Sequence, residues 1–150
     1  MEQQINQMRQ EFNRLIKEMD DLYREVARVL GLSDSAFDIL FALYELGDGC
    51  LQKDICTLSF SSKQTINSSI RNLERNGLLY LKAGRGRNMH IILTESGRKL
   101  LEEKIAPAAE LERETMEALS CEERRELLAL TRKYTACFRD KVSEWKKCDS

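Results

Sequence analysis

The side chains best suited to forming specific contacts lie between positions 61 and 76, where hydroxyl, carboxamide and basic groups are frequent. Glu74 is the only acidic residue in 61–77. Carboxamides can pair with adenine edges and arginines with phosphates, so this combination is typical of a helix that binds DNA. An ordinary solvated helix surface is the alternative, but such a surface usually mixes Glu with Lys. The predicted DNA-binding residues of this segment are Ser61, Ser62, Lys63, Gln64, Thr65, Asn67, Ser68, Arg71 and Arg75.

A second basic cluster follows closely, in residues 82–87. Its two glycines allow the backbone to turn sharply, and β-prone runs over 78–81 and 89–93 border it on both sides. We therefore expect a two-stranded hairpin with a positively charged tip. Arginines at such a tip can enter a narrow minor groove and read its shape. The predicted DNA-binding residues of the tip are Lys82, Arg85 and Arg87.

No residue pattern indicates catalysis or a metal site. His90 is the only histidine, so a site built from several histidines is excluded, and its position in a strand favours a structural role. Paired acids such as Glu102 and Glu103 fall on exposed helix positions and indicate a solvated surface. We expect no catalytic residue, no metal ion and no cofactor.

The five cysteines have irregular spacing and no C-x-x-C pair, which favours reduced thiols in a cytoplasmic protein. Cys56 and Cys137 lie beside apolar stripes, so we expect both to be buried structural thiols. Cys50 follows a glycine at a helix start, where a thiolate could be stabilised, and Cys148 falls in a polar tail. A thiol-based redox-sensing regulator is kept as an alternative function.

Two short helices joined by a tight turn are predicted to carry the polar segment. Apolar spacing favours a helix over 51–58. Ser61 and Gln64 form a capping-box pattern that opens a second helix, which ends at Asn76 and Gly77. Two such helices, the second with few apolar residues, are the parts of a helix-turn-helix.

Further helices are expected on both sides of this pair. Ser33 can cap a helix that ends at Gly47. Thr94 can cap a long helix that reaches about residue 118, with a kink at Pro107 because proline has no backbone N–H. The predicted fold class is mainly α: a winged helix-turn-helix core with a two-stranded β-wing, flanked by long N- and C-terminal helices.

Both terminal helices are amphipathic and need a surface against which to bury their apolar stripes. In residues 2–30 the apolar side chains step by three and four in an unbroken heptad pattern. Ser120 and Glu123 form a capping box that opens the last helix, over about 121–146. The stripes can pack within the chain, but two of them favour a homodimer interface. The predicted dimerisation residues are Ile5, Met8, Phe12, Leu15, Met19, Leu127, Leu130, Tyr134 and Phe138.

The net charge of −1 over 150 residues hides an uneven distribution. Residues 1–48 carry a net charge of −5, residues 49–90 of +5 and residues 91–150 of −1. A local positive patch, not the total charge, decides where a polyanion binds. No apolar run approaches the roughly 18 residues of a membrane span, and no secretory signal is evident, so we expect a cytoplasmic protein.

Residues 32–97 resemble the core of the multiple antibiotic resistance regulator (MarR) family of bacterial transcription factors. The matching segments are 62–67, 73–78 and 93–97, and flanking helices of suitable length extend the similarity over nearly the whole chain. The resemblance implies a homodimer that binds double-stranded DNA, with one helix in the major groove and the wing in the minor groove. The implied division is an N-terminal dimerisation helix (1–31), a DNA-binding domain (32–97) and C-terminal dimerisation helices (98–150).

The resemblance also implies that a small-molecule effector binds between the dimerisation helices and the winged domain. Phe12, Phe37 and Phe41 are the candidate lining residues, although a core role fits each of them. In this family an acid usually stands two positions before the wing arginine, whereas here Arg85 precedes Arg87. The usual ion pair is therefore absent, and we expect stronger attraction to phosphate and a steep salt dependence.

The predicted function is a sequence-specific transcriptional regulator, acting as a repressor on a pseudo-palindromic operator. A winged-helix protein-interaction module is the alternative from a different class. That alternative predicts an apolar patch on the 62–76 helix, where the sequence has Ser, Asn and Arg instead.

Overall fold

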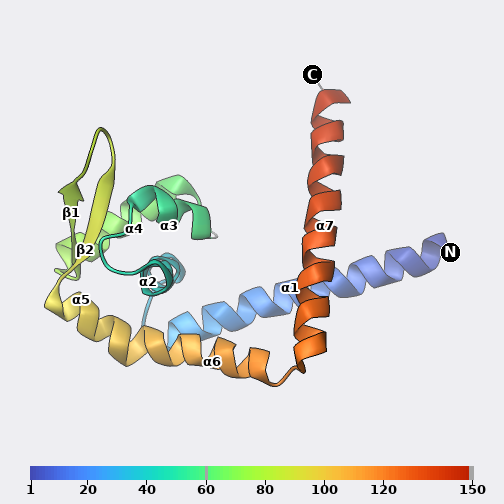
Figure 1. Cartoon of the computed structure of the whole chain (residues 1–150), viewed down its shortest axis with the longest axis horizontal. Helices are drawn as coiled ribbons and strands as arrows, with labels where there is room; N and C mark the ends of the chain where they lie inside the picture. The colour runs from blue at the N-terminus through green and yellow to red at the C-terminus, as the bar shows by residue number, and fades with distance from the viewer. Residues whose placement is uncertain (60, 149–150) are drawn as a thin grey trace. The chain divides into compact units, whose positions relative to one another are not determined.

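The computed structural model describes residues 1–59 and 61–148, which form two compact units, Met1–Ala109 and Glu110–Ser150. Figure 1 shows the order of the elements. The division by role at 31 and 97 stays a prediction. The helices are α1 (Glu2–Val29), α2 (Asp34–Leu46), α3 (Gln52–Leu58), α4 (Lys63–Arg75), α5 (Glu95–Leu100), α6 (Ala106–Glu117) and α7 (Cys121–Cys148), with strands β1 (Leu79–Ala83) and β2 (Met89–Leu93).

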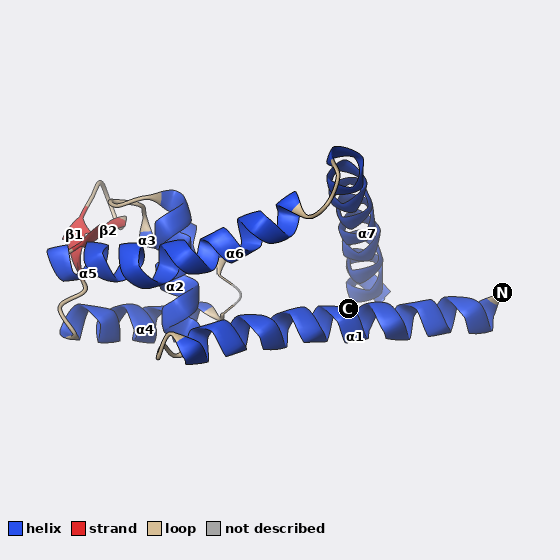
Figure 2. Ribbon diagram, turned by 90° about the horizontal axis from the view of Figure 1, so that it is seen from below, coloured by secondary structure: helices blue, strands red, loops and turns tan. Residues whose placement is uncertain are grey.

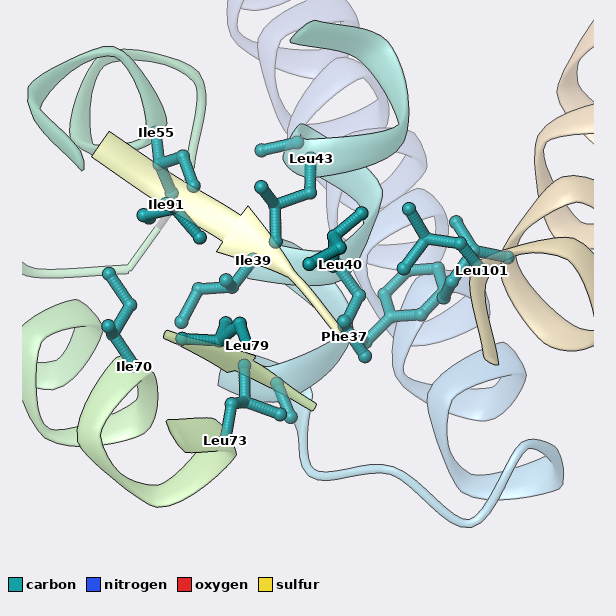
Figure 3. Close-up of a cluster of buried hydrophobic side chains, with 14 of the residues drawn as sticks. Phe37, Ile39, Leu40, Leu43, Ile55, Ile70, Leu73, Leu79, Ile91 and Leu101 are labelled. Atoms are coloured by element: carbon teal, nitrogen blue, oxygen red, sulfur yellow. The ribbon is translucent and has the colours of Figure 1, made fainter. Parts of the chain in front are cut away.

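Helix α2 lies at the centre of the first unit, because apolar residues cover most of its surface. Ile39, Leu40 and Leu43 are fully buried, and side chains from the surrounding helices and strands converge on them (Figure 3). Ile70 on α4 and Leu79 on β1 belong to the same cluster. Burying a side chain of this size contributes roughly 1.5–3 kcal/mol, so this core fixes the positions of α4 and the hairpin.

The first turn of α4 differs from its prediction by one residue. The capping box of Ser61 and Gln64 is wrong, because Ser62 is the cap and its Oγ accepts a hydrogen bond of 3.2 Å from Thr65 N–H. Ser61 instead donates its hydroxyl to Asp38 Oδ2 on α2, at 2.9 Å. This contact with a residue far away in the sequence decides which of the two adjacent serines caps the helix.

The other predicted caps are confirmed. Ser33 Oγ accepts a hydrogen bond from the third residue of α2, and Thr94 Oγ1 accepts one from Gly97 N–H at 3.0 Å. In the second unit, Ser120 N–H donates to Glu123 Oε2 at 2.7 Å and Glu123 N–H donates to Ser120 Oγ at 3.2 Å. Both halves of that capping box are therefore formed.

The hairpin is confirmed as an antiparallel pair, shifted by one residue at its start. Its register runs from Leu79 opposite Leu93 to Ala83 opposite Met89. Leu51, just before α3, forms an isolated bridge with the second strand and so attaches α3 to the hairpin. We refer to β1, β2 and the loop between them as the wing.

The helix after the wing is interrupted before Pro107. Residues Leu101–Ile105 form a π-helical turn, in which Ala106 N–H donates to Leu101 O five residues back. Pro107 has no N–H and cannot donate to the carbonyl of residue 103, which accounts for an irregularity at this place. Lys104 Nζ, within the turn, donates to Leu30 O at 2.7 Å and so attaches the segment to the end of α1.

Helix α1 touches the core only near its C-terminal end. Ala27 is its only fully buried residue, and most of the helix extends away from the winged core (Figure 2). Its apolar stripe is open to solvent in the isolated chain, with Met8 65% and Leu15 51% exposed. The stripe of α7, in the other unit, is equally open, with Leu130 58% and Phe138 61% exposed.

Candidate nucleic-acid interface

Helix α4 buries one narrow side and presents the rest to solvent. Its buried side chains are Ile66, Ile70 and Leu73, which pack into the core. The outward side chains near its N-terminal half line an open hollow on the surface. The residues that line this first hollow are Lys63, Gln64, Asn67, Ser68 and Arg71.

A second hollow joins α4 to α3 and the wing. Lys63 and Asn67 line this hollow as well as the first, so the two surfaces share residues. Basic groups surround the second hollow, since α3 contributes Lys53 and the wing contributes Arg87. The other residues that line it are Leu51, Gln52, Cys56, Asn88 and Met89. We call the two hollows together the reading surface.

Six of the predicted DNA-binding residues line the reading surface, and the other six are outside its two hollows. Ser61 is half-buried, and burial raises the pKa of its partner Asp38, although the hydrogen bond from Ser61 opposes this shift. Ser62 and Thr65 join their hydroxyls at 2.8 Å in the cap of α4. Arg75, at the other end of the helix, is exposed and donates from Nε to Arg71 O at 3.4 Å.

The wing cations are free of carboxylate partners. Lys82, Arg85 and Arg87 are exposed, and none of them forms an ion pair with a residue in 1–59 or 61–148. Of the three, Arg87 lines the second hollow. The absence of an acid at position 85 thus leaves the wing charge uncompensated.

Two carboxylates hold the wing in place. Glu74 Oε1, on α4, accepts a hydrogen bond of 3.2 Å from Leu81 N–H. Asp48 Oδ1 accepts one of 2.8 Å from Leu93 N–H, and its Oδ2 accepts two from Arg98 at 3.2 and 2.8 Å. Partial burial of Asp48 opposes ionisation, but these hydrogen bonds and the Arg98 charge lower its pKa overall.

Gln52 and Lys53 on α3 and Asn88 on the wing also line the reading surface, although they are not among the residues predicted to bind DNA. Gln52 Nε2 donates a hydrogen bond of 2.7 Å to Asn67 Oδ1, so a residue of α3 holds a carboxamide on the predicted reading helix. The two helices of a helix-turn-helix meet near this point. Polar residues on the first helix are therefore candidates for DNA contact as well, and the sequence alone could have indicated them.

The surroundings of the single histidine and of the half-buried Cys50 argue against a reactive role for either residue. His90 Nδ1 is 2.8 Å from Gly49 O, a hydrogen bond that fixes the ring in a structural role, as predicted. Burial raises the pKa of Cys50, and the nearby Asp54 and Asp48 raise it further. The predicted stabilisation of a Cys50 thiolate is therefore wrong, because anions and partial burial surround it where cations would be needed.

The burial of the other cysteines agrees only in part with the prediction. Cys56 is half-buried and packs against the core, close to the expected structural role. Cys137 is exposed in the isolated chain, so its predicted burial is wrong there, because α7 has no buried residue in the described part of the second unit. Cys148 is exposed, as predicted, and Cys121 is exposed too.

The three candidate effector-binding aromatics occupy different environments. Phe37 is buried and Phe41 half-buried, and their ring centroids are 5.6 Å apart at an interplanar angle of 53°. Phe12 on α1 remains 40% exposed. Their role in ligand binding stays a prediction.

Within residues 1–59 and 61–148, no three His, Cys, Asp or Glu side chains gather where they could bind a metal ion together. None of the helices described is both long and apolar enough to span a bilayer.

Helices α3 and α4, which follow each other closely in the sequence and precede a wing, define a winged helix-turn-helix protein. A model of the MarR family matches residues 30–87, which cover α2 to the tip of the wing. Over these residues the chain is similar to the MarR family of transcription regulators. No curated protein sequence matches it.

Solved structures of MarR-type regulators resemble the chain over most of its length. Staphylococcus aureus MepR in its DNA-binding conformation is 28% identical with a TM-score of 0.71, covering 87% of this chain and 98% of its own. A MepR–DNA complex has 28% identity and a TM-score of 0.65, and the match covers 85% of this chain and 94% of the MepR chain. Bordetella bronchiseptica BpsR, whose DNA binding is regulated by 6-hydroxynicotinic acid, has the same fold at 23% identity and a TM-score of 0.63. That match covers 83% of this chain and 98% of the BpsR chain.

Proposed function

We propose that this protein is a homodimeric repressor that binds a pseudo-palindromic operator, with α4 in the major groove and the wing in the adjacent minor groove. The observation that carries the proposal is the reading surface, in which carboxamides and hydroxyls of α4 are continuous with cations of α3 and the wing. Direct readout needs short polar side chains near base edges, with basic groups on the flanking phosphates.

The chemistry of α4 favours DNA over a protein partner. A protein-docking helix would present apolar side chains, whereas Ile66, Ile70 and Leu73 are buried in the core. The sole acid of the helix, Glu74, accepts a hydrogen bond from the wing backbone. The outward side of α4 is thus polar and basic, which supports contact with a polyanion.

The exposed stripe of α1 supports the dimer. Ile5, Met8, Phe12, Leu15 and Met19 are each at least 40% exposed along one side of a helix of 28 residues. A continuous apolar strip of this length is unusual on a monomer and is typical of an association surface. A second copy, related by a two-fold axis, covers the stripe and presents a second reading helix.

The exposed stripe of α7 is assigned to the same role. Leu127, Leu130, Tyr134 and Phe138 are between 44% and 61% exposed, and the last two rings stack at a centroid distance of 6.3 Å. The two reading helices then meet half-sites about 34–36 Å apart, one turn of DNA. This spacing is the reason for expecting an operator with two-fold symmetry.

A small-molecule effector completes the proposal. BpsR, which shares the fold, responds to 6-hydroxynicotinic acid, and this precedent supports a similar control here. We assign the effector to the region of Phe12, Phe37 and Phe41, which belong to α1 and α2 of the first unit. A ligand releases DNA if it binds better to a dimer whose reading helices have the wrong separation. The role is binding, with no catalytic step.

The proposal is tested with two substitutions in the reading surface. Asn67→Ala should weaken operator binding by about 1–3 kcal/mol, the value of a good side-chain pair with a base. Arg87→Ala should weaken it similarly at fixed salt, while sedimentation still shows a dimer. Fluorescence anisotropy with an operator selected from random duplexes measures both.

Arg139→Ala provides the matched control, because Arg139 is an exposed arginine on α7 outside the reading surface. It should bind the operator as the unchanged protein does. If Asn67→Ala and Arg87→Ala also bind unchanged, α4 and the wing do not contact DNA and the assignment is wrong.

A further inference from the structure

Gln52 and Asn67 form a carboxamide pair that joins the two helices of the helix-turn-helix. Gln52 stands at the first position of α3 and Asn67 in the second turn of α4, and Nε2 of the former donates to Oδ1 of the latter at 2.7 Å. Both side chains line the second hollow, together with Lys63 and Arg87. The pair therefore lies within the surface assigned to DNA.

The hydrogen bond decides which end of each amide is left for a ligand. A carboxamide has one donor end and one acceptor end. Because Asn67 Oδ1 accepts from Gln52, Asn67 offers its Nδ2 donor, and because Gln52 uses Nε2, it offers its Oε1 acceptor. Among residues 1–59 and 61–148, neither of these remaining groups makes a side-chain hydrogen bond.

We propose that Gln52 is a specificity-determining residue, which holds the Asn67 amide so that the pair presents a donor beside an acceptor and selects adenine. This inference rests on the proposed DNA-binding function. Adenine shows an N7 acceptor next to an N6 donor in the major groove, which is the complement of the pair. Guanine shows two acceptors there and meets Gln52 Oε1 unfavourably.

Replacing Gln52 by Glu tests the proposal, because it should change the preferred base in a predictable way. A carboxylate can only accept hydrogen bonds, so the contact with Asn67 must reverse and Asn67 Nδ2 must donate to it. Asn67 then turns Oδ1 outward, and the pair presents two acceptors. Cytosine, whose N4 amino group is a donor, becomes the preferred base. A merely structural role for Gln52 does not predict this change from adenine to cytosine.

The experiment compares base preferences in sequences selected from a library of random DNA duplexes. The full-length protein and its variants Gln52→Leu, Gln52→Glu, Asn67→Ala and Gln52→Leu with Asn67→Ala are used. The unchanged protein should enrich adenine at one position of each half-site. Gln52→Leu and Asn67→Ala should each reduce that preference about ten-fold at the same position, and the double variant should lose no more than either alone.

Gln64→Leu is the matched control, since Gln64 lines the first hollow but makes no side-chain hydrogen bond with another described residue. Its effect should add to that of Asn67→Ala and leave the adenine position unchanged. Circular dichroism and thermal unfolding establish that each variant is folded.

The outcomes separate this inference from the proposed function. If the unchanged protein enriches no sequence, the proposed function fails and the inference falls with it. If a motif is enriched but Gln52→Leu keeps the base preference that Asn67→Ala loses, the inference alone is overturned. Retention of adenine by Gln52→Glu overturns it as well. A change to cytosine supports it.

Discussion

Asp48 joins the end of α2 to the wing and to α5 through one carboxylate. Its Oδ1 accepts from Leu93 N–H in β2, and its Oδ2 accepts from the Arg98 guanidinium. Hydrogen bonds to a charged acceptor are stronger than those between neutral groups. The orientation of the wing relative to the core therefore depends partly on the ionisation of Asp48.

Asp48→Asn should lower stability in a pH-dependent manner. The pKa of Asp48 is lowered in the folded chain, so its charged form stabilises the fold above its ordinary pKa of about 4, and this contribution is lost as the pH falls below that value. The variant keeps an acceptor for Leu93 but loses the charge that attracts Arg98. Urea unfolding should show a deficit at pH 7 that shrinks in acid.

Asp140→Asn serves as the control for this measurement, because Asp140 is exposed on α7 and forms no ion pair with a described residue. It should leave stability nearly unchanged at every pH. A deficit for Asp48→Asn that is equally large at pH 7 and in acid would contradict the role given to its charge.

At the scale of elements, α1 is the helix that the core supports least. One buried residue, Ala27, anchors it, and most of its apolar stripe is exposed in the isolated chain. Isolated helices are marginal in water, so most helical stability comes from packing of an apolar side. The proposed association with another copy would account for the length of α1.

Leu15→Glu should shift the protein from dimer to monomer. The stripe of α1 is buried in the proposed dimer, and a carboxylate in the middle of it then costs on the order of several kcal/mol when it has no partner. Analytical ultracentrifugation should show the shift, and affinity for the operator should fall with it. Gln10→Glu adds the same charge on the opposite side of α1 and should remain dimeric. A Leu15→Glu variant that is still dimeric would place the interface elsewhere.

The helices and the hairpin could be predicted because their signals are local. The heptad steps of α1 and the caps Ser33, Thr94 and Ser120 depend on residues within about one turn, which the sequence displays directly. Ile66, Ile70 and Leu73, which are buried, also follow the spacing of one helix side.

Features that depend on contacts between distant residues could not be predicted. The choice of Ser62 over Ser61 as cap depends on Asp38, 23 residues before Ser61, and the Gln52–Asn67 pair spans 15 residues. Gly97 is another such case: a Cβ there would lie 1.9 Å from Leu78 O, so the close approach of α5 to the start of β1 requires glycine. Single-sequence patterns contain no information on such distances.

For the molecule as a whole, the distribution of charge matters more than the total. The net charge is −1, yet residues 49–90 carry +5 and include α3, α4 and the wing. The acidic segment 1–48 includes α1, whose proposed role is association with another copy. Separation of the two functions along the chain reconciles a nearly neutral protein with a polyanionic partner.

Salt dependence should reveal this separation. The logarithm of operator affinity should fall steeply with the logarithm of salt concentration, because each phosphate neutralised releases counterions. Arg85→Ala and Arg87→Ala should each reduce the slope by about 1, whereas Arg139→Ala should leave it unchanged. A slope near zero for the unchanged protein would contradict a phosphate-binding role for the positive segment.

The bond between Glu74 and the wing has a consequence for solubility. β1 pairs with β2 on one side only, and an edge strand with free N–H groups is a site where another chain can add a strand. Glu74 Oε1 occupies Leu81 N–H on β1, and Cys50 O accepts from Ile91 N–H on β2, at 2.9 Å. Each margin of the small sheet therefore has an N–H group that is already satisfied within the chain, which lowers the tendency of that margin to pair with a strand of another chain.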